Sequence, residues 1–265
     1  MNNIYILIGC IIVVCESITM YCYLHKKTHI SLSYLYKDNL IVCILIAALT
    51  GWCISLLGIW ALLIGVVLVP VLGLLLTMIR FFRFPLRKRV QKENAIISPA
   101  DGNIIYIKRI EKGDIPMSTK EGVTATLQEF TNVDMDYPCI IIGINMTPFD
   151  VHRNATPIAG RVVMNQHFDG ETLSLKNPAA IARNERNTIV LDNGRFRVGV
   201  VQTASRLVRR VVTNCKVGDI MEQGQWFGMI KFGSQVDVII PANAHICVNI
   251  KEQVYVRKTI LATFD

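Results

Sequence analysis

Charge is scarce in this chain, and one long stretch has none. Of 265 residues, 18% are charged and 8% aromatic, whereas 52% are hydrophobic and the mean hydropathy is +0.40. Residues 40–79 carry no charged side chain, and Glu16 is the only one in residues 4–24. This composition excludes an ordinary soluble domain over the whole length. A helix of forty residues is about 60 Å long, enough to cross a hydrocarbon core of about 30 Å twice.

We therefore expect a membrane anchor over residues 1–80, with transmembrane helices near 4–24, 40–57 and 61–80 and a tight hairpin around Gly58. The N-terminus lacks both basic residues and a small-residue cleavage site, which argues against a signal peptide. Glu16 is an intramembrane acid, which either has a functional role or marks a first helix that inserts poorly.

The basic residues flank the apolar stretches and set the expected orientation. The positive-inside rule places the first loop and the juxtamembrane linker, residues 81–93, in the cytoplasm. We expect a multi-pass protein of the cell membrane with its C-terminal part on the cytoplasmic side. The linker suits anionic lipid headgroups, or is a plain stop-transfer flank, and the net charge of +8 gives no reason to expect nucleic acid. The basic residues that set this orientation are Lys26, Lys27 and Lys37 in the loop, and Arg83, Arg87, Lys88, Arg89 and Lys92 in the linker.

Cysteine pairs with metal-binding or redox spacing are also lacking. No Cys-x-x-Cys occurs, and five of the eight cysteines fall in or beside the apolar stretches, where they act as small hydrophobic residues. We expect no disulfide, no zinc or other metal, and a reducing compartment. The eight are Cys10, Cys15, Cys22, Cys43, Cys53, Cys139, Cys215 and Cys247.

From residue 94 the pattern changes to short segments rich in valine and isoleucine, punctuated by Gly, Pro, Asn and Asp. This is typical of a mainly β domain, which we place at residues 94–265. Tight turns open strands at 99–102, 157–160 and 217–224, and the last resembles the turn of lipoyl and biotinyl carrier domains. We therefore expect a lipoyl/biotinyl-like barrel-sandwich hybrid. The expected strands are 103–107, 139–145, 160–164, 188–191, 196–202, 208–213, 235–240 and 245–250.

The segment around Gly233 and Ser234 organises this domain. Apolar residues lead from Trp226 to Phe232, and alternation resumes after Ser234, which predicts two strands with a break at Gly233. A Gly-Ser pair of this kind is ordinarily a bulge or a turn. It also permits a sharper reading, because the unhindered carbonyl of Gly233 is open to attack by the hydroxyl of Ser234.

Several sequence blocks in order resemble the phosphatidylserine decarboxylases, in the short form found in many bacteria and archaea. Together they extend from about residue 81 to 240 and are highly specific. They are Phe81-Phe82-Arg83-Phe84-Pro85, Ser98-Pro99-Ala100-Asp101-Gly102, Met146-Thr147-Pro148-Phe149-Asp150-Val151-His152, Asn184-Glu185-Arg186-Asn187, Val208-Arg209-Arg210-Val211 and Phe227-Gly228-Met229-Ile230-Lys231-Phe232-Gly233-Ser234.

The resemblance implies a zymogen that cuts itself between Gly233 and Ser234. Ser234 would attack the Gly233 carbonyl, and elimination would leave fragments 1–233 and 234–265, which stay associated, with Ser234 converted to a pyruvoyl group. That group would form a Schiff base with phosphatidylserine and withdraw electrons as CO₂ leaves, giving phosphatidylethanolamine. The family uses no external cofactor and no metal. A membrane phospholipid and the bilayer are the expected partners, and assembly as a homodimer is left open.

The resemblance also suggests roles for individual residues. His152 is the leading candidate for proton transfer, with Asp101 orienting its imidazole as in a Ser-His-Asp arrangement. Ala155 stands where the long form has a second histidine, so either His152 serves both steps or another group takes one. Substrate binding is expected from Arg209 or Arg210 and from His167, although a solvated charge or an ion pair to Glu185 suits the arginines equally. His167 is expected in a loop, where it either lies near the site or is simply solvated.

Two other hypotheses remain. A membrane-tethered carrier or adaptor of the same hybrid fold would modify an exposed lysine, but Lys231, between Ile230 and Phe232, matches the carrier motif poorly. A degenerate relative without turnover is motivated only by Ala155.

Overall fold

The computed structural model divides the chain into two compact units, Met1–Ile79 and Arg80–Asp265. In the first unit it describes residues 4, 6–9, 11–12, 14–15, 18–19, 22, 44, 47–49, 51–56 and 78–79, all of them helical. In the second it describes residues 81–85, 87–112, 117–118, 124–125, 136, 138–147, 150–171, 173, 180–204, 211–231 and 234–265. Within these ranges, no helix combines the length and the apolar character needed to cross a bilayer. The predicted helices near 4–24 and 40–57 are described only in part, with every described residue helical, and the helix predicted near 61–80 lies largely outside the described residues. That these segments cross the membrane stays a prediction.

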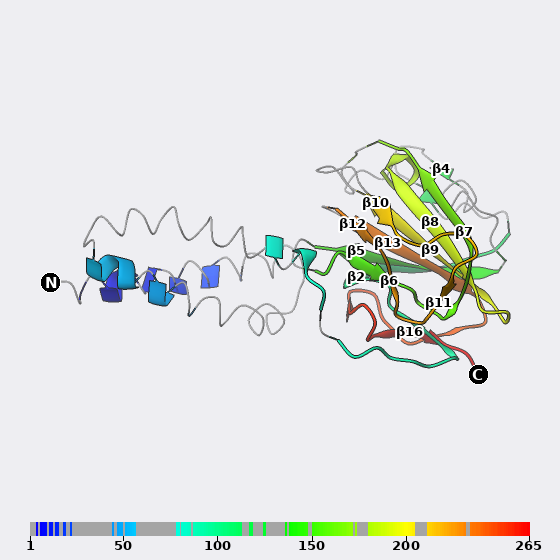
Figure 1. The fold of residues 1–265 in the computed structure, drawn as a ribbon. Coiled ribbons are helices and arrows are strands. Elements are labelled where there is room, and N and C mark those ends of the chain that lie inside the picture. The colour runs from blue at the N-terminus through cyan, green and yellow to red at the C-terminus, as the bar shows by residue number, and fades with distance from the viewer. Residues whose placement is uncertain are drawn as a thin grey trace. The chain divides into compact units, whose positions relative to one another are not determined.

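The second unit is built from strands, which confirms the prediction of a mainly β domain (Figure 1). Its longer strands are β2 (Gly102–Ile110), β5 (Cys139–Met146), β7 (Gly160–Phe168), β8 (Arg186–Asp192), β9 (Arg197–Ala204), β12 (Trp226–Ile230) and β13 (Ser234–Pro241). The short elements are β1 (Ala95–Ile97), β3 (Met117–Ser118), β4 (Thr124–Ala125), β6 (Arg153–Ala155), α5 (Ala180–Arg183), β10 (Val211–Thr213), β11 (Ile220–Met221), β14 (His245–Ile246), β15 (Gln253–Val254) and β16 (Ile260–Thr263).

One antiparallel sheet of eight strands dominates, in the order β11-β7-β8-β9-β13-β5-β2-β15. Strand β13 lies inside it, paired with β5 along its whole length and with β9 from Ser234 to Ile239. Because hydrogen bonds form on both sides of β13, this strand is held more firmly than an edge strand would be. The two neighbours of β13 are far from it in the sequence.

Alternation along these strands produces the core. Val236, Val238 and Ile240 of β13 face the same side as Ile142 and Ile144 of β5, and all five side chains are buried in one apolar cluster. Burying an aliphatic side chain of this size stabilises a fold by about 2 kcal/mol. The period of two residues seen in the sequence therefore corresponds to a buried face.

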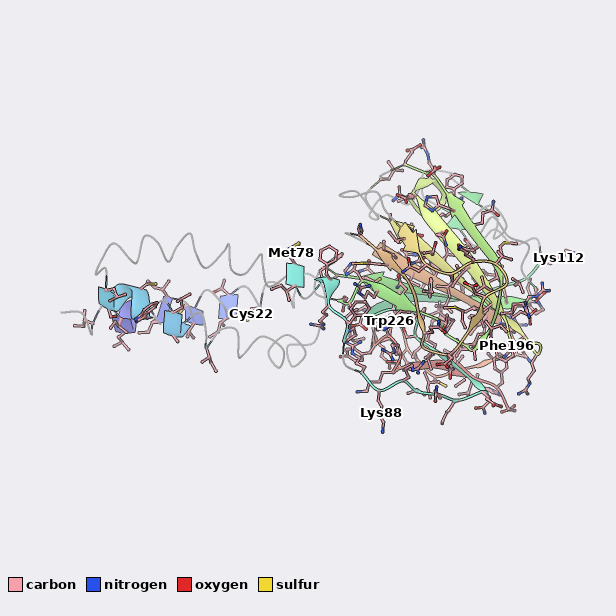
Figure 2. The ribbon with its side chains drawn as sticks, viewed as in Figure 1. Cys22, Met78, Lys88, Lys112, Phe196 and Trp226 are labelled. Carbon is pink, nitrogen blue, oxygen red and sulfur yellow. The ribbon has the colours of Figure 1, made fainter. Side chains whose placement is uncertain are left out.

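Two three-stranded sheets, β10-β12-β6 and β1-β16-β14, complete this core. They contribute Phe227 and Ile230 from β12, Ile96 from β1 and Leu261 from β16 to the same cluster. Side chains fill the interior of the unit (Figure 2). The barrel-sandwich arrangement of lipoyl domains stays a prediction.

The turn before β2 needs its glycine. Gly102 has a φ of +153°, and a Cβ at this position would collide with the backbone carbonyl oxygen of Asn145. A residue without a side chain allows this close approach of two strands. Asp101, the preceding residue, is thereby placed where β2 and β5 come together.

One expected strand ends early. Residues 245–250 were predicted as a single strand, but β14 contains only His245 and Ile246. A turn follows, in which Asn249 and Glu252 bond to each other at 2.9 and 3.1 Å, and Lys251 takes a positive φ of 73°. The polar residues Asn249, Lys251 and Glu252 favour this turn over an extended chain. Strand β10 begins at Val211, and residues 208–210 of its predicted range lie outside the described residues.

Candidate active site

Three of the sequence blocks meet at one end of the large sheet: the block that begins at Phe81, the block Met146–His152 and the block Phe227–Ser234. Ser234 is the first residue of β13 and lies in register with Met146 of β5 and Ala204 of β9. The strand before the break, β12, lies beside the end of the block Met146–His152. The amide of Ile230 donates to the carbonyl of His152 at 3.1 Å. The break predicted between two strands is confirmed, since β12 ends at Ile230 and β13 begins at Ser234.

His152 is fully buried and rigidly oriented. Its ring stacks on Phe81, with ring centroids 3.7 Å apart and an angle of 21° between the planes. Its Nδ1 lies 2.9 Å from the backbone carbonyl of Asp150. Because a carbonyl only accepts, Nδ1 carries the proton and Nε2 carries a lone pair. Nε2 has no hydrogen-bond partner among the residues that the structure describes.

Burial keeps the His152 imidazole neutral. It lowers the pKa of His152 to about 4, although the hydrogen bond to the Asp150 carbonyl acts in the opposite direction. At neutral pH the side chain is therefore a base with a free lone pair, which is the form needed to accept a proton from a hydroxyl group.

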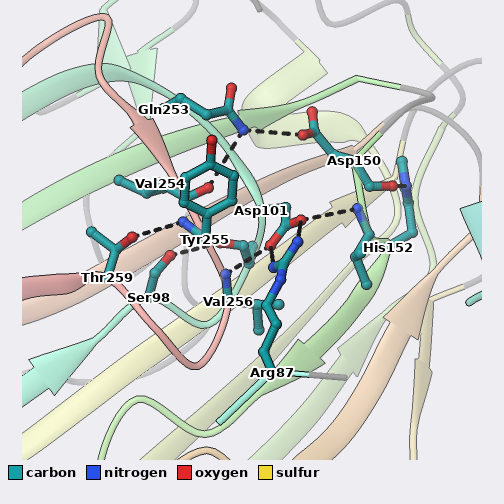
Figure 3. Close-up of polar contacts among 12 residues, drawn as sticks. Arg87, Ser98, Asp101, Asp150, His152, Gln253, Val254, Tyr255, Val256 and Thr259 are labelled. Atoms are coloured by element: carbon teal, nitrogen blue, oxygen red, sulfur yellow. Dashed lines mark hydrogen bonds and ion pairs between the residues drawn. The ribbon is translucent and has the colours of Figure 1, made fainter. Parts of the chain in front are cut away.

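Asp150 shapes the turn that carries this carbonyl. Its Oδ2 accepts hydrogen bonds of 2.8 Å from both the amide and the hydroxyl of Thr147. Its Oδ1 accepts a hydrogen bond of 3.1 Å from Gln253 (Figure 3). Burial, followed by the nearby charge of Asp101, raises the pKa of Asp150 to about 6. We did not single out Asp150 from the sequence, although the Thr-x-x-Asp spacing is a turn signal that could have indicated it.

Asp101 is held by an arginine of the linker. Arg87 donates from Nη1 and Nη2 to the two carboxylate oxygens at 2.5 and 2.9 Å, and the amides of Val256 and Val151 also donate to Asp101, at 2.7 and 3.5 Å (Figure 3). In this structure Asp150 and Phe81 orient the imidazole of His152. A direct contact between Asp101 and the imidazole stays a prediction.

Sequence reasoning also missed Arg87 as a site residue, because it lies in a run of basic residues that is explained equally well by membrane topology.

The same linker brings aromatic residues to the site. Phe81 and Phe82 contact each other edge to face, and Arg153, the residue after His152, places its guanidinium 3.4 Å from the centre of the Phe84 ring. Within the Phe-Phe-Arg-Phe-Pro block, Phe81 packs on the imidazole of His152 and Phe84 packs on the guanidinium of Arg153.

His167 was expected in a loop but lies on β7, near Glu185, the residue before β8. Its Nε2 is 3.2 Å from Asp169 and 3.4 Å from Glu185, and its side chain is half-exposed. Glu185 is tied to the same region, because its carboxylate accepts from the amide of Val211 at 3.1 Å and its carbonyl from the amide of Ala204 at 2.9 Å. Ala204 is the neighbour of Ser234, so the Asn-Glu-Arg-Asn block borders the site.

Gly233, Arg209 and Arg210 lie outside the described residues, so their predicted roles stay predictions. Lys231 directly follows β12 and is half-buried, an environment that does not favour a carrier lysine. Within the part of the chain that the structure describes, no group of three or more His, Cys, Asp or Glu residues is placed to hold a metal ion.

Comparison with known proteins explains why these sequence blocks lie together at one end of the large sheet. The family model for phosphatidylserine decarboxylase matches residues 74–262, a range that contains all the sequence blocks. The chain belongs to the phosphatidylserine decarboxylase family. The prediction of an enzyme of this family is confirmed.

Individual relatives cover most of the domain. A protein of Methanocaldococcus jannaschii, provisionally named archaetidylserine decarboxylase proenzyme, is 42% identical over 196 residues, which are 73% of this chain and 93% of the relative. A phosphatidylserine decarboxylase proenzyme of Chlorobium chlorochromatii is 35% identical over 190 residues, or 72% of this chain and 80% of the relative. Another, from Geotalea uraniireducens, is 34% identical over 182 residues, which are 68% of this chain and 76% of the relative.

Proposed function

We propose that this protein decarboxylates phosphatidylserine to phosphatidylethanolamine, using a pyruvoyl group formed from Ser234 when the chain cuts itself after Gly233. The names of the relatives support the substrate class, a phospholipid with a serine headgroup, and describe those proteins as proenzymes. The observation that carries the proposal is the buried Nε2 of His152. It has no hydrogen-bond partner among the described residues and lies at the end of the sheet where Ser234 begins.

Self-cleavage requires a base for the hydroxyl of Ser234. His152, whose pKa is about 4, is neutral at physiological pH and accepts that proton at Nε2. Attack of Oγ on the Gly233 carbonyl breaks the peptide C–N bond and forms an ester with a free amine at position 234. Loss of the α proton and of the Gly233 carboxylate leaves dehydroalanine, and water then replaces its nitrogen, releasing ammonia and leaving the ketone.

The residues of this end of the sheet fit such a group. When present, the pyruvoyl group supplies an electrophilic carbonyl that withdraws electrons from the carbon that loses CO₂. We propose that His152, once it has accepted a proton, delivers it to that carbon. Phe81 stacks on the buried imidazole and shields it from water, and His167, Arg209 and Arg210 are proposed to bind the headgroup.

Strand pairing supports the association of the two fragments after cleavage. In the large sheet β13 belongs to the fragment 234–265, whereas its neighbours β5 and β9 belong to the fragment 1–233. The apolar cluster likewise mixes residues of both, for example Val238 with Ile142. Separating the fragments would expose this core, so they stay together without a covalent bond.

We further propose that the enzyme resides in the cell membrane as a multi-pass protein, with the β unit at headgroup level on the cytoplasmic side. The support is the uncharged stretch 40–79 followed by the basic linker. A diacyl lipid leaves the bilayer only at high cost, so its headgroup must be processed at the surface. A homodimer remains an additional hypothesis.

Mass spectrometry and activity assays test the function together. The purified parent protein should consist of two fragments, the smaller with a ketone that borohydride reduces, and should release CO₂ from phosphatidylserine in mixed micelles. Ser234→Ala should remain one inactive chain. The conservative change Thr203→Val, on the neighbouring strand, should be cut and active. Cleavage in Ser234→Ala, or an active parent without cleavage, would overturn the proposal.

A further inference from the structure

A second polar cluster lies on the face of the large sheet opposite the core, one residue beyond Ser234. Gln235 donates from Nε2 to the hydroxyl of Tyr106 at 2.9 Å and to both carboxylate oxygens of Asp237, at 3.0 and 3.1 Å. The hydroxyl of Tyr106 donates to Asp237. Asp237 is fully buried and Gln235 is 3% exposed. The proposed catalytic steps use none of these three residues.

The strand register shows that the cluster spans three adjacent strands. Tyr106 of β2 and Asp237 of β13 are both in register with Gly143 of β5, which lies between them. A Cβ at position 143 would come within 2.5 Å of the Tyr106 ring. The glycine therefore provides the space in which the ring crosses β5 to reach Asp237.

Charged side chains also lie on this face of the sheet. The ammonium group of Lys108 lies 5.1 Å from the centre of the Tyr106 ring, and the guanidinium of Arg186, on β8, packs 3.9 Å from the ring of Phe168. Burial raises the pKa of Asp237 to about 7, and it also raises the pKa of Tyr106. A buried polar network like this one adds little net stability compared with an apolar core, but it fixes one arrangement of the strands that carry it.

We propose that Tyr106, Gln235 and Asp237 form a clamp that holds the first residues of β13 in place after the bond before Ser234 is broken. The proposal rests on the proposed self-cleavage. The three residues are positioning residues, since they orient the group at position 234 without touching the substrate.

The physical reason is the new chain end. Before cleavage, residue 234 is tied covalently to β12 through residues 231–233. After cleavage it is the free end of a strand, and strand ends fray when few contacts hold them. Gln235 is the nearest side chain to that end, and the clamp joins it to β2, two strands away in the sheet. The orientation of the reactive group would otherwise vary, and misplacement by about 1 Å can slow a reaction about a hundredfold.

Hydrogen exchange in the full-length protein tests the clamp. Tyr106→Phe keeps the ring over Gly143 and removes the hydroxyl. In the cut protein we expect amides 235–237 to exchange about tenfold faster than in the parent. We also expect kcat to fall about tenfold with KM unchanged, because the substrate is not contacted.

Two comparisons separate positioning from general stability. Thr203 lies in register with Gln235, and its buried hydroxyl has no partner among the described residues, so Thr203→Val removes a buried hydroxyl from the same face without breaking the clamp. It should leave exchange and kcat unchanged. In the uncut Ser234→Ala chain, adding Tyr106→Phe should change exchange at 235–237 less than about twofold, because the covalent link still holds the strand.

Three results would overturn the clamp. If the parent is cut but Tyr106→Phe behaves like Thr203→Val, the clamp is wrong and the proposed function stands. An equal effect of Tyr106→Phe in cut and uncut chains would show that the cluster serves only stability, and would also overturn the clamp. A parent that is never cut would overturn both proposals.

Discussion

Arg87 and Asp101 form a two-point ion pair inside the catalytic unit, with nitrogen–oxygen distances of 2.5 and 2.9 Å. The carboxylate is completely buried and the arginine side chain is 16% exposed. A guanidinium fork matches a carboxylate in this geometry, and neither lysine nor a solvated charge would replace it. The basic linker therefore has an internal structural role, whatever its relation to the membrane.

Removing Arg87 should destabilise the protein. Arg87→Ala leaves a buried carboxylate without its main partner, which we expect to cost about 3 kcal/mol in the free energy of unfolding. Denaturant unfolding of the detergent-solubilised protein measures this loss. The matched control is Arg89→Ala, because Arg89 pairs with Glu222 at 2.6 Å on the surface and should contribute less than about 1 kcal/mol. Equal losses in the two variants would contradict the assignment.

His152 should determine the pH dependence of self-cleavage. With a pKa of about 4, the imidazole is neutral and active from pH 8 down to about pH 5, and it becomes protonated below that. The cleavage rate of freshly synthesised precursor should therefore be flat above pH 5 and fall near pH 4. His152→Ala should not be cut, whereas His245→Ala, which changes an exposed histidine paired with Asp265, should be cut normally. A cleavage rate that falls already near pH 6.5 would contradict a buried, neutral base.

The same group should affect stability. Because the pKa of His152 is lowered on folding from 6.5 to about 4, folding disfavours its protonated form. The contribution to stability is fully present above pH 6.5 and is lost as the pH falls through about 4. Thermal unfolding of His152→Gln should accordingly depend less on pH between 6.5 and 4 than unfolding of the parent. Identical pH profiles would rule out this shift.

Asp150 should act through the turn it closes. Asp150→Ala removes the acceptor of two hydrogen bonds from Thr147 and one from Gln253, which should cost about 2 kcal/mol and slow self-cleavage, because the carbonyl that orients His152 is no longer fixed. Thr147→Val loses one of these bonds and should have an intermediate effect. Calorimetry and gel-based cleavage rates measure both. A fully cut, equally stable Asp150→Ala protein would show that the turn does not position the imidazole.

Asp237 should make the protein less stable at high pH. Burial raises its pKa from 3.8 to about 7, so the folded state binds this proton more tightly than the unfolded state does. The corresponding stability is fully present below pH 3.8 and is lost as the pH rises through about 7. The melting temperature of Asp237→Asn minus that of the parent should therefore be larger at pH 8 than at pH 5. A difference that is the same at both pH values would contradict the raised pKa.

The strands were predictable because their signal is local. Alternation at Val236, Val238 and Ile240 identified β13, and the glycine before Ser234 identified the break. The prediction of a strand at 245–250 was wrong because the strand ends after Ile246 and a turn closed by Asn249 and Glu252 follows. The sequence blocks also identified the family, since they combine residue type with order along the chain.

Partners of charged groups were not predictable in this way. Asp101 and Val256 are 155 residues apart, and the sequence offers several arginines for one buried carboxylate. His152 was identified as a candidate base, but the acceptor that orients it is a backbone carbonyl, which has no sequence signature.

By itself, the amino-acid sequence determined where strands form, which family the chain belongs to and which histidine and serine are candidates for chemistry, because these follow from residue type and spacing along the chain. Only the tertiary structure decided that Arg87 pairs with Asp101, that Nδ1 of His152 is the nitrogen bonded to the Asp150 carbonyl, and that Tyr106 reaches Asp237 across Gly143. Those relationships depend on the order and register of strands from distant segments, and contacts between distant segments arise only when the whole sheet is assembled.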